Sequence, residues 1–213
     1  MSRHNHPVSE SRWSEVEAAI AAAPYPVDVL PPDPPSSQLC LDRLGITTRS
    51  WLGAVVAHTG GLLIDHGWLR VLGGGGGPLP DVASQAEPAL KLLVVAHDVL
   101  GGQFAWVESQ PGAGATVHYF GPDSLSWEDL GRSYSDWLAA MLAGALTDFY
   151  DSLRWPGWEA DVAAVSPDHG LHTLPPPWMA VEDPSTISRK SVPMPELIAL
   201  HHEFARQLGD RPG

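Results

Sequence analysis

Apolar residues recur at helical intervals in two stretches near the start of the chain. In residues 11–23 they lie three and four positions apart, so this segment is expected to form a short helix that the following proline ends. A second helix is expected after a cap at Thr48 or Ser50. The pair Gly60-Gly61 ends it, because glycine adopts a left-handed conformation at little cost.

Shorter apolar runs between residues 62 and 120 predict strands. The segment 62–73 has one such run on each side of a glycine, which predicts a pair of strands or a strand followed by a turn. Residues 90–96, 103–108 and 116–120 are rich in β-formers and are separated by glycine-rich segments. These three runs are therefore expected to form an antiparallel meander.

The C-terminal half shows helical spacing at both ends and weak patterning between them. Residues 134–149 have apolar side chains three, four and seven positions apart, which predicts a long amphipathic helix. Residues 125–130 are expected to form one helical turn at most. A final helix is expected from Pro195, a favoured first helical residue, to Gly209. The stretch 159–193 is proline-rich and predicts no clear element.

Two segments are expected to be loops within a single domain. Residues 24–37 contain six prolines, which fix backbone angles and remove donors, so we expect an extended surface loop and no strand. The pentaglycine run at 73–77 is expected to be a mobile connector. A length of 213 residues fits one domain, assigned to residues 1–180, with an extension over 181–213 that packs on it.

Composition and charge narrow the classes of protein and partner. The 21 glycines and 21 prolines exclude a coiled coil or a plain helix bundle. With 25 acidic against 12 basic residues, the net charge of −13 repels phosphate backbones and anionic membranes, so neither nucleic acid nor a membrane is expected as a partner. A basic protein fits this charge better. One cysteine and no long apolar run predict a cytoplasmic protein.

Several short motifs between residues 45 and 150 follow a recognisable order. They are Thr59-Gly60-Gly61, the runs 94–104 and 117–123, and the run 134–138. This order resembles the SUKH superfamily, whose bacterial members include many toxin-neutralising immunity proteins. The resemblance implies an α+β fold with a mixed, mostly antiparallel sheet flanked by helices, which serves as a protein-binding scaffold. It implies no shared catalytic residues.

A second set of motifs resembles an uncharacterised bacterial family of unknown function in or beside that superfamily. These motifs are the runs 51–54, 64–70 and 149–158, together with Gly60-Gly61. Residues 159–213 have no counterpart in the resemblance. It therefore assigns no chemistry to the C-terminal part of the chain.

Two adjacent acid–imidazole pairs, Asp65-His66 and His97-Asp98, are the strongest candidates for chemistry. Each lies beside glycines, where a carboxylate can orient an imidazole that acts as a general base. Neighbours on an extended backbone point to opposite faces, however, so such a pair seldom meets one substrate. Turn hydrogen bonding is the simpler interpretation. A small-molecule-binding or hydrolytic enzyme requires both pairs to line one pocket.

Other patterns give no catalytic, cofactor or metal site. His169 and His172 are expected in a proline-rich loop, and His201-His202-Glu203 lacks the order of a zinc helix. The glycine run is followed by prolines and lacks the lysine of a phosphate loop. We therefore expect no metal and no cofactor, and we assign no catalytic residue.

The nine tryptophans provide the other candidate site. Several lie beside glycine or proline, and Arg154 joins two of them in one short segment, a combination enriched in protein interfaces. The alternative is that these aromatic rings form a lid at the edge of the core. The candidate binding surface comprises Asp65, Trp68, Arg70, Asp98, Arg154, Trp155 and Trp158.

These observations together predict a non-enzymatic protein-binding module of SUKH-like α+β fold. Its expected partner is a basic protein such as a toxin, which the acidic charge would attract at a salt-sensitive rate. The alternative is the small-molecule-binding or hydrolytic enzyme that uses the two acid–imidazole pairs. The residues do not predict an oligomeric state.

Overall fold

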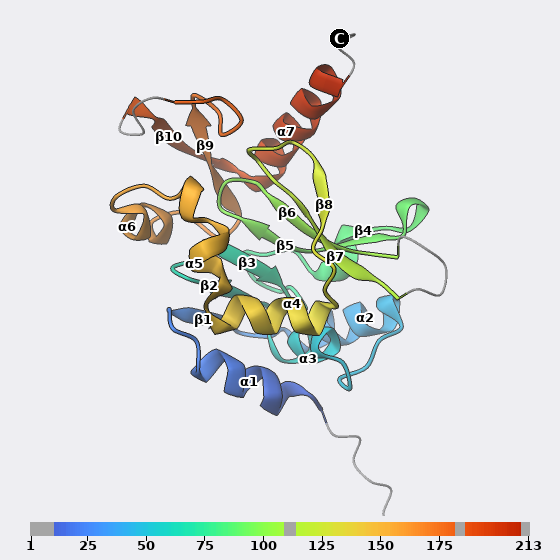
Figure 1. Ribbon diagram of the computed structural model, residues 1–213. Coiled ribbons are helices and arrows are strands. Elements are labelled where there is room, and N and C mark those ends of the chain that lie inside the picture. The colour runs from blue at the N-terminus through green and yellow to red at the C-terminus, as the bar shows by residue number, and fades with distance from the viewer. Residues whose placement is uncertain (1–10, 109–113, 182–185, 210–213) are drawn as a thin grey trace, which may run out of the picture.

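An eight-stranded antiparallel sheet forms the centre of the protein, whose computed structural model describes residues 11–108, 114–181 and 186–209 (Figure 1). The strand order is β1-β2-β3-β5-β6-β7-β8, and β4 pairs with the first part of β5. The strands are β1 (Val27–Leu30), β2 (Gly61–Ile64), β3 (Leu69–Leu72), β4 (Ala86–Glu87), β5 (Leu92–Asp98), β6 (Gln103–Val107), β7 (Thr116–Phe120) and β8 (Trp127–Asp129).

Helices and a smaller sheet lie on the two sides of this central sheet. Figure 1 places α1, α3 and α4 together on one side, and α7 with the two-stranded sheet of β9 and β10 on the other. The α+β fold predicted from the sequence is confirmed. The α-helices and the two strands of the smaller sheet are α1 (Trp13–Ala21), α2 (Pro34–Leu44), α3 (Trp51–His58), α4 (Tyr134–Ala140), α5 (Leu146–Phe149), α6 (Trp158–Ala163), β9 (His169–Leu174), β10 (Ser188–Pro193) and α7 (Met194–Gly209).

The long periodic segments fold as predicted. The first helix, the strand pair, the meander and the final helix correspond to α1, β2–β3, β5–β6–β7 and α7. Ser50 caps α3 by accepting a hydrogen bond from the Gly53 amide at 3.0 Å. The predicted helix over 134–149 contains a π-helical turn at Met141–Ala145, where Gly144 has φ 117°. Helix α3 ends at extended Thr59 rather than at a left-handed glycine.

The proline-rich segment 24–37 is not the extended loop that was predicted. Residues 27–30 form β1, which pairs with β2, and Pro34 and Pro35 occupy the first turn of α2. Asp33 caps that helix by accepting from the Ser36 amide at 3.2 Å. Proline is tolerated in a first helical turn because amides there have no intrahelical acceptor. The prolines therefore frame two elements instead of preventing them.

Two further segments differ from their predictions. Residues 127–129 form strand β8 against β7, not a helical turn, because the partner strand supplies the hydrogen bonds. The stretch 159–193 contains α6, β9 and β10, so His169 and His172 lie on a strand. Strand β9 pairs with β10 across the expected boundary near residue 180.

The pentaglycine run is a packed connector over its first three residues, which are buried. A Cβ at Gly74 would lie 2.2 Å from Ser37 Oγ and 2.5 Å from the Val56 carbonyl. Only glycine allows so close an approach between this segment and the two helices. The mobile connector predicted for this run is therefore wrong for its buried part.

The two faces of the sheet are named here for the helices that cover them. The α4 face carries Phe104 and Tyr119, and the Phe104 ring packs 5.1 Å from that of Trp137 on α4. The α7 face carries Gln103 and Phe120, and the Phe120 ring lies 4.6 Å from that of His202 on α7. Among residues 11–108, 114–181 and 186–209, no helix is both long and apolar enough to cross a membrane.

Candidate functional site

The last two residues of β5, His97 and Asp98, point to opposite faces of the sheet. In the pairing of β5 with β3, Asp98 lies opposite Leu69 and His97 lies opposite Arg70. Paired residues share a face and successive residues alternate, so the two side chains lie on different faces. The alternation agrees with the expectation that an adjacent acid–imidazole pair does not meet one substrate. Each residue therefore has its own environment.

The Asp98 carboxylate is fully buried on the α4 face and accepts four hydrogen bonds. Two come from the amides of Leu100 and Gly102, each at 2.9 Å, within the hairpin that follows β5. The other two come from the hydroxyl groups of Tyr119 at 2.8 Å and Tyr150 at 3.1 Å. Burial raises the pKa of this carboxyl group, and the four donors oppose that rise. The turn-bonding interpretation holds for Asp98.

The pair Asp65-His66 lies in the turn between β2 and β3. Both residues have positive φ angles, 55° and 59°, and the Trp68 amide donates to the Asp65 carbonyl at 3.0 Å. The Asp65 carboxylate is buried and forms an ion pair with Arg154. The Arg154 guanidinium lies 4.1 Å from the ring centre of Trp158. This carboxylate therefore fixes an arginine among aromatic rings.

The two acid–imidazole pairs do not converge on one pocket. His97 lines one cavity and His66 a different, smaller one, and neither Asp65 nor Asp98 is among the described residues that line these two cavities. Within the described chain, no hydrogen bond or ion pair joins Asp65-His66 to His97-Asp98. The geometry required for the hydrolytic alternative is absent from this arrangement.

Most of the candidate binding surface is buried. The structure brings Asp65, Trp68, Arg154, Trp155 and Trp158 into one cluster, in which the Trp68 ring lies 5.7 Å from Trp155 and 5.1 Å from Trp158. Trp68 is completely buried and Trp155 is only 7% exposed. The edge-of-core interpretation describes these rings better than an open surface does, because the segment after α5 folds back over the β2–β3 turn.

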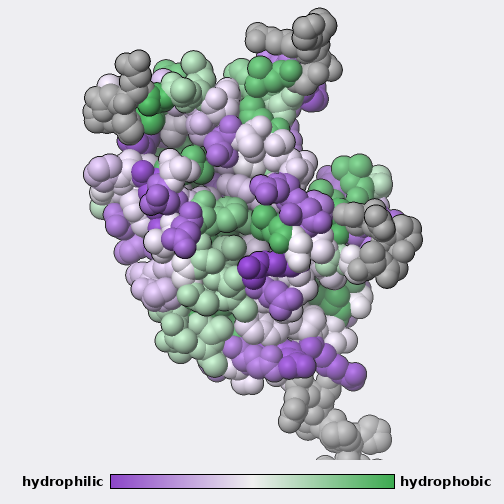
Figure 2. Space-filling model, in the orientation of Figure 1, coloured by the Kyte–Doolittle hydropathy of each residue, from purple (hydrophilic) through white to green (hydrophobic). Residues whose placement is uncertain are grey.

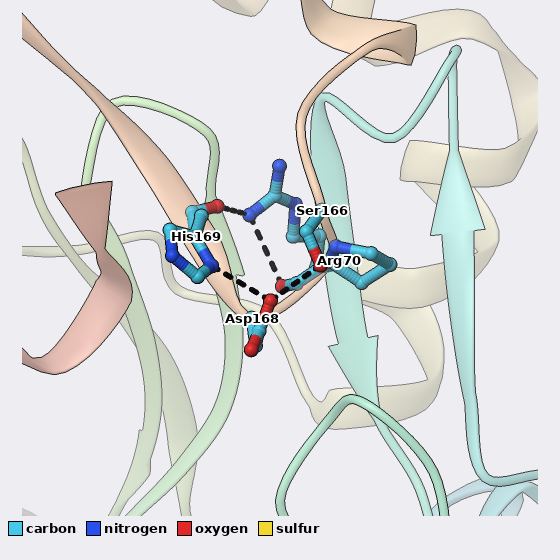
Figure 3. Close-up of polar contacts among 5 residues, drawn as sticks. Arg70, Ser166, Asp168 and His169 are labelled. Carbon is cyan, nitrogen blue, oxygen red and sulfur yellow. Dashed lines mark hydrogen bonds and ion pairs between the residues drawn. The ribbon is translucent and has the colours of Figure 1, made fainter. Parts of the chain in front are cut away.

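Arg70 lies on the α7 face and is also buried. Its Nε donates to the Gly67 carbonyl at 3.1 Å, and its Nη1 donates to the carbonyls of Pro167, at 3.1 Å, and His169 (Figure 3). Burial lowers its pKa to about 10, although the charge of Asp98 opposes this. Arg70 thus holds the start of β9 against the central sheet, and it is not part of an exposed surface.

A cavity of about 610 Å³ lies on the α7 face beside Arg70. Its walls come from the ends of β5 and β6, the first turns of α7, the loop before β9 and the segment after the glycine run. Residues that line this His97 cavity include Leu79, His97, Gln103, Asp168, Met194 and Ile198. Ligand pockets in proteins commonly have this size and this mixture of apolar walls with few polar groups.

His97 is the most unusual group in the cavity wall. It is 5% exposed, and its Nε2 atom is buried without a hydrogen-bond partner. Burial lowers the pKa of His97 to about 4, and the nearby Arg70 charge acts in the same direction. The imidazole is therefore neutral at physiological pH. Gln103, which also lines the cavity, has its Oε1 atom 2.6 Å from His202 Nε2. This contact fixes the position of the Gln103 side chain.

The remaining histidines form no metal centre within the described residues. Asp168 and His169 are paired at 2.8 Å, but no group of three or more His, Cys, Asp or Glu side chains in residues 11–108, 114–181 and 186–209 gathers around one point. His201 is buried against Trp178, with ring centres 5.6 Å apart.

Sequence reasoning missed the partners of the residues that it identified. Tyr119 and Tyr150 bind Asp98 from 21 and 52 positions away in the chain, and no local pattern indicates such a contact. Gln103 was placed only in a predicted strand, and Met194 and Ile198 only near or on a helix. Strand alternation from His97 identifies Gln103 once the hairpin register is known.

Comparison with known proteins gives a family and two similar chains. Residues 5–197 match the family described as protein of unknown function DUF2625. The uncharacterised protein YbfG of Escherichia coli is 34% identical over 201 residues, which cover 92% of each chain. An uncharacterised protein of Haemophilus influenzae is 34% identical over 162 residues, which cover 71% of each chain. Neither description assigns an activity.

Proposed function

The chain belongs to the DUF2625 family of proteins of unknown function, and we propose that it is a non-enzymatic binding protein that holds a small molecule in the His97 cavity. The single observation that carries this proposal is that His97, whose Nε2 atom is buried without a partner, lines that cavity. A buried polar atom without a partner costs about 1–3 kcal/mol, and a ligand that supplies the missing hydrogen bond recovers this free energy.

The surroundings of His97 favour an uncharged ligand with one hydrogen-bonding group. The imidazole is neutral, so it offers a donor or an acceptor but no charge to pair with an ion. Leu79, Met194 and Ile198 supply apolar walls that favour a hydrocarbon or heteroaromatic body. The Gln103 side chain adds a second polar group near the imidazole. A heteroaromatic amide has the required chemistry.

Binding fits this site better than catalysis does. Both candidate aspartates are occupied by structural partners, Asp65 by Arg154 and Asp98 by two amides and two tyrosines. A general base needs a hydrogen-bond partner of its own to orient it and a nucleophile beside it. The Nε2 atom of His97 has no hydrogen-bond partner within the described residues. The proposal therefore assigns it recognition of the ligand.

The test is a screen of uncharged heteroaromatic amides against the full-length protein by NMR, with detection of the His97 ring nitrogens. We expect saturable binding that shifts the Nε2 signal and that weakens at least about tenfold in His97→Leu. The matched control is His201→Leu, because His201 is also buried with an unpartnered nitrogen but does not line the cavity. Equal binding to wild type and His97→Leu would contradict the proposal.

Recognition of a basic protein by a cytoplasmic, SUKH-like immunity protein is kept as a second proposal. The net charge of −13 favours it, because an acidic protein attracts a basic partner over long range. On the face in Figure 2, hydrophilic residues are spread among weakly apolar ones. Burial of Trp68 and Trp155 means that such a partner would contact the protein through this acidic exterior instead of the aromatic cluster.

A further inference from the structure

Two of the few basic residues of this acidic chain line one small pocket. Arg154, from the segment after α5, and Arg189, from β10, both contribute to a pocket of about 210 Å³ that is separate from the His97 cavity. This arginine pocket is lined by Ser152, Arg154, Trp155, Thr173, Met179 and Arg189, among others. With 12 basic against 25 acidic residues, such a pairing needs an explanation.

Aromatic rings hold both guanidinium groups in place. The Arg189 guanidinium carbon lies 4.0 Å from the ring centre of Trp155, and that of Arg154 lies 4.1 Å from the ring centre of Trp158. Stacking on an aromatic face fixes the plane of a guanidinium group and reduces the entropy lost when it binds a ligand. Both arginines are therefore arranged before any ligand arrives.

Both arginines form hydrogen bonds through a terminal nitrogen, and in both the Nε donor is left without an acceptor. Arg154 pairs with Asp65 through Nη2, and Arg189 donates through Nη1 to the Ile187 carbonyl at 3.2 Å. The Nε atom of each arginine is buried and has no hydrogen-bond partner. Native proteins rarely leave a buried charged donor unsatisfied, because the donor loses its hydrogen bonds to water and gains none in return.

We propose that the arginine pocket binds a small oxyanion, a carboxylate or a phosphate group, between Arg154 and Arg189. A guanidinium group carries a planar fork of N–H donors that matches the spacing of two oxygens on either anion. Thr173, which is buried, and Ser152 carry hydroxyl groups in the same lining and can donate to the remaining oxygens. The volume accommodates such a group with part of the molecule that carries it.

The charges around the pocket are compatible with one anion. Asp65 neutralises part of the Arg154 charge, and Asp161 accepts from the Trp155 indole at 2.7 Å. Neither aspartate is among the residues that line the pocket. Burial lowers the pKa of Arg189, which reflects a charge that is poorly solvated at this position. A bound oxyanion would replace that lost solvation.

The experiment follows the arginine Nε–Hε NMR signals of the full-length protein during titration with inorganic phosphate and, separately, with acetate, at constant ionic strength. We expect saturable shifts of the Arg154 and Arg189 signals with at least one of these probes. A response to phosphate alone identifies a phosphate site, and a response to acetate alone identifies a carboxylate site. A response to both supports recognition of the shared oxyanion geometry.

Two variants of Arg189 separate specific recognition from charge attraction. Arg189→Gln should weaken binding at least about tenfold, and Arg189→Lys should weaken it similarly because lysine keeps the charge but lacks the planar fork of donors. The matched control is Arg206→Gln, which removes an exposed arginine from α7 and should leave the affinity unchanged. Linear shifts without saturation, or full affinity in Arg189→Lys, would overturn the proposal.

Discussion

Asp98 and His97 are neighbours in the chain but meet very different environments on the two faces of the sheet. On the α4 face, the Asp98 carboxylate accepts hydrogen bonds from two amides and two tyrosines. On the α7 face, the His97 Nε2 atom has no partner, and His97 lines a cavity. Both groups are buried, so exposure does not separate them. What separates them is whether the protein itself satisfies the buried group.

Under the proposed function, this difference separates a residue that stabilises the fold from a residue that recognises a ligand. A satisfied polar group inside a dense core makes the core specific but has nothing left to offer a ligand. An unsatisfied group in a cavity wall reduces stability and keeps a hydrogen bond for another molecule. Substitutions on the two faces should therefore affect different measurements.

The largest effect is expected for Asp98→Ala on the α4 face. This change leaves two amides and two tyrosine hydroxyls without their acceptor, and we expect the free energy of unfolding to fall by about 3 kcal/mol or more. Urea unfolding measures it, with Asp148→Ala on the exposed surface as the control. A loss under about 1 kcal/mol would mean that these donors are satisfied in another way.

Acidification should produce the next largest effect, and it acts on the α7 face. The folded-state pKa of His97 is about 4 against an ordinary value of 6.5, so the unfolded chain binds a proton first as the pH falls. Stability should therefore decrease between about pH 6.5 and 4, by about 2 kcal/mol at pH 5 from His97 alone.

The pH dependence is measured as the difference between wild type and His97→Leu in urea unfolding at pH 7 and pH 5. His201, whose pKa is also about 4, contributes equally to both proteins and cancels. The raised pKa of Asp98 acts in the opposite direction and cancels as well. If wild type and variant lose the same free energy, His97 is not held neutral in the folded protein.

The smallest effect is expected for His97→Leu at neutral pH. Leucine removes an unsatisfied polar atom and keeps a similar volume, so the free energy of unfolding should change by less than about 1 kcal/mol. Thermal unfolding at pH 7.5 checks this. A loss as large as that of Asp98→Ala would remove the distinction between the two faces, because His97 would then be a structural residue like its neighbour.

Elements can be predicted from the sequence where one hydrophobic periodicity continues over the whole segment. The prediction fails where pairing with a distant strand determines the conformation. Helices α1 and α7 and the β5–β6–β7 meander follow from apolar spacing within each segment. Strand β8 is three residues long and almost without apolar alternation, so only its pairing with β7 defines it. Strand β1 was hidden by flanking prolines, whose number suggested a loop although their positions leave residues 27–30 free to pair.

The candidate site was predicted by residue type but not by environment. Alternation along β5 correctly separated His97 from Asp98, because a strand fixes the direction of neighbouring side chains. The glycines and proline around Trp155 and Trp158 suggested a surface segment. The structure instead folds that segment onto Trp68, and the contact depends on the Asp65–Arg154 ion pair across 89 positions, which no local pattern encodes.

The carbonyl acceptors of Arg70 also limit when the α7 face can fold during synthesis of the chain. The Pro167 and His169 carbonyls follow Arg70 by 97 and 99 positions, so on the ribosome the arginine is synthesised long before its acceptors. Until they emerge, this face of β3 must keep its guanidinium in water, since burial without acceptors is costly. The nascent chain therefore cannot close the α7 face early, and a chain cut before residue 167 would keep that face open.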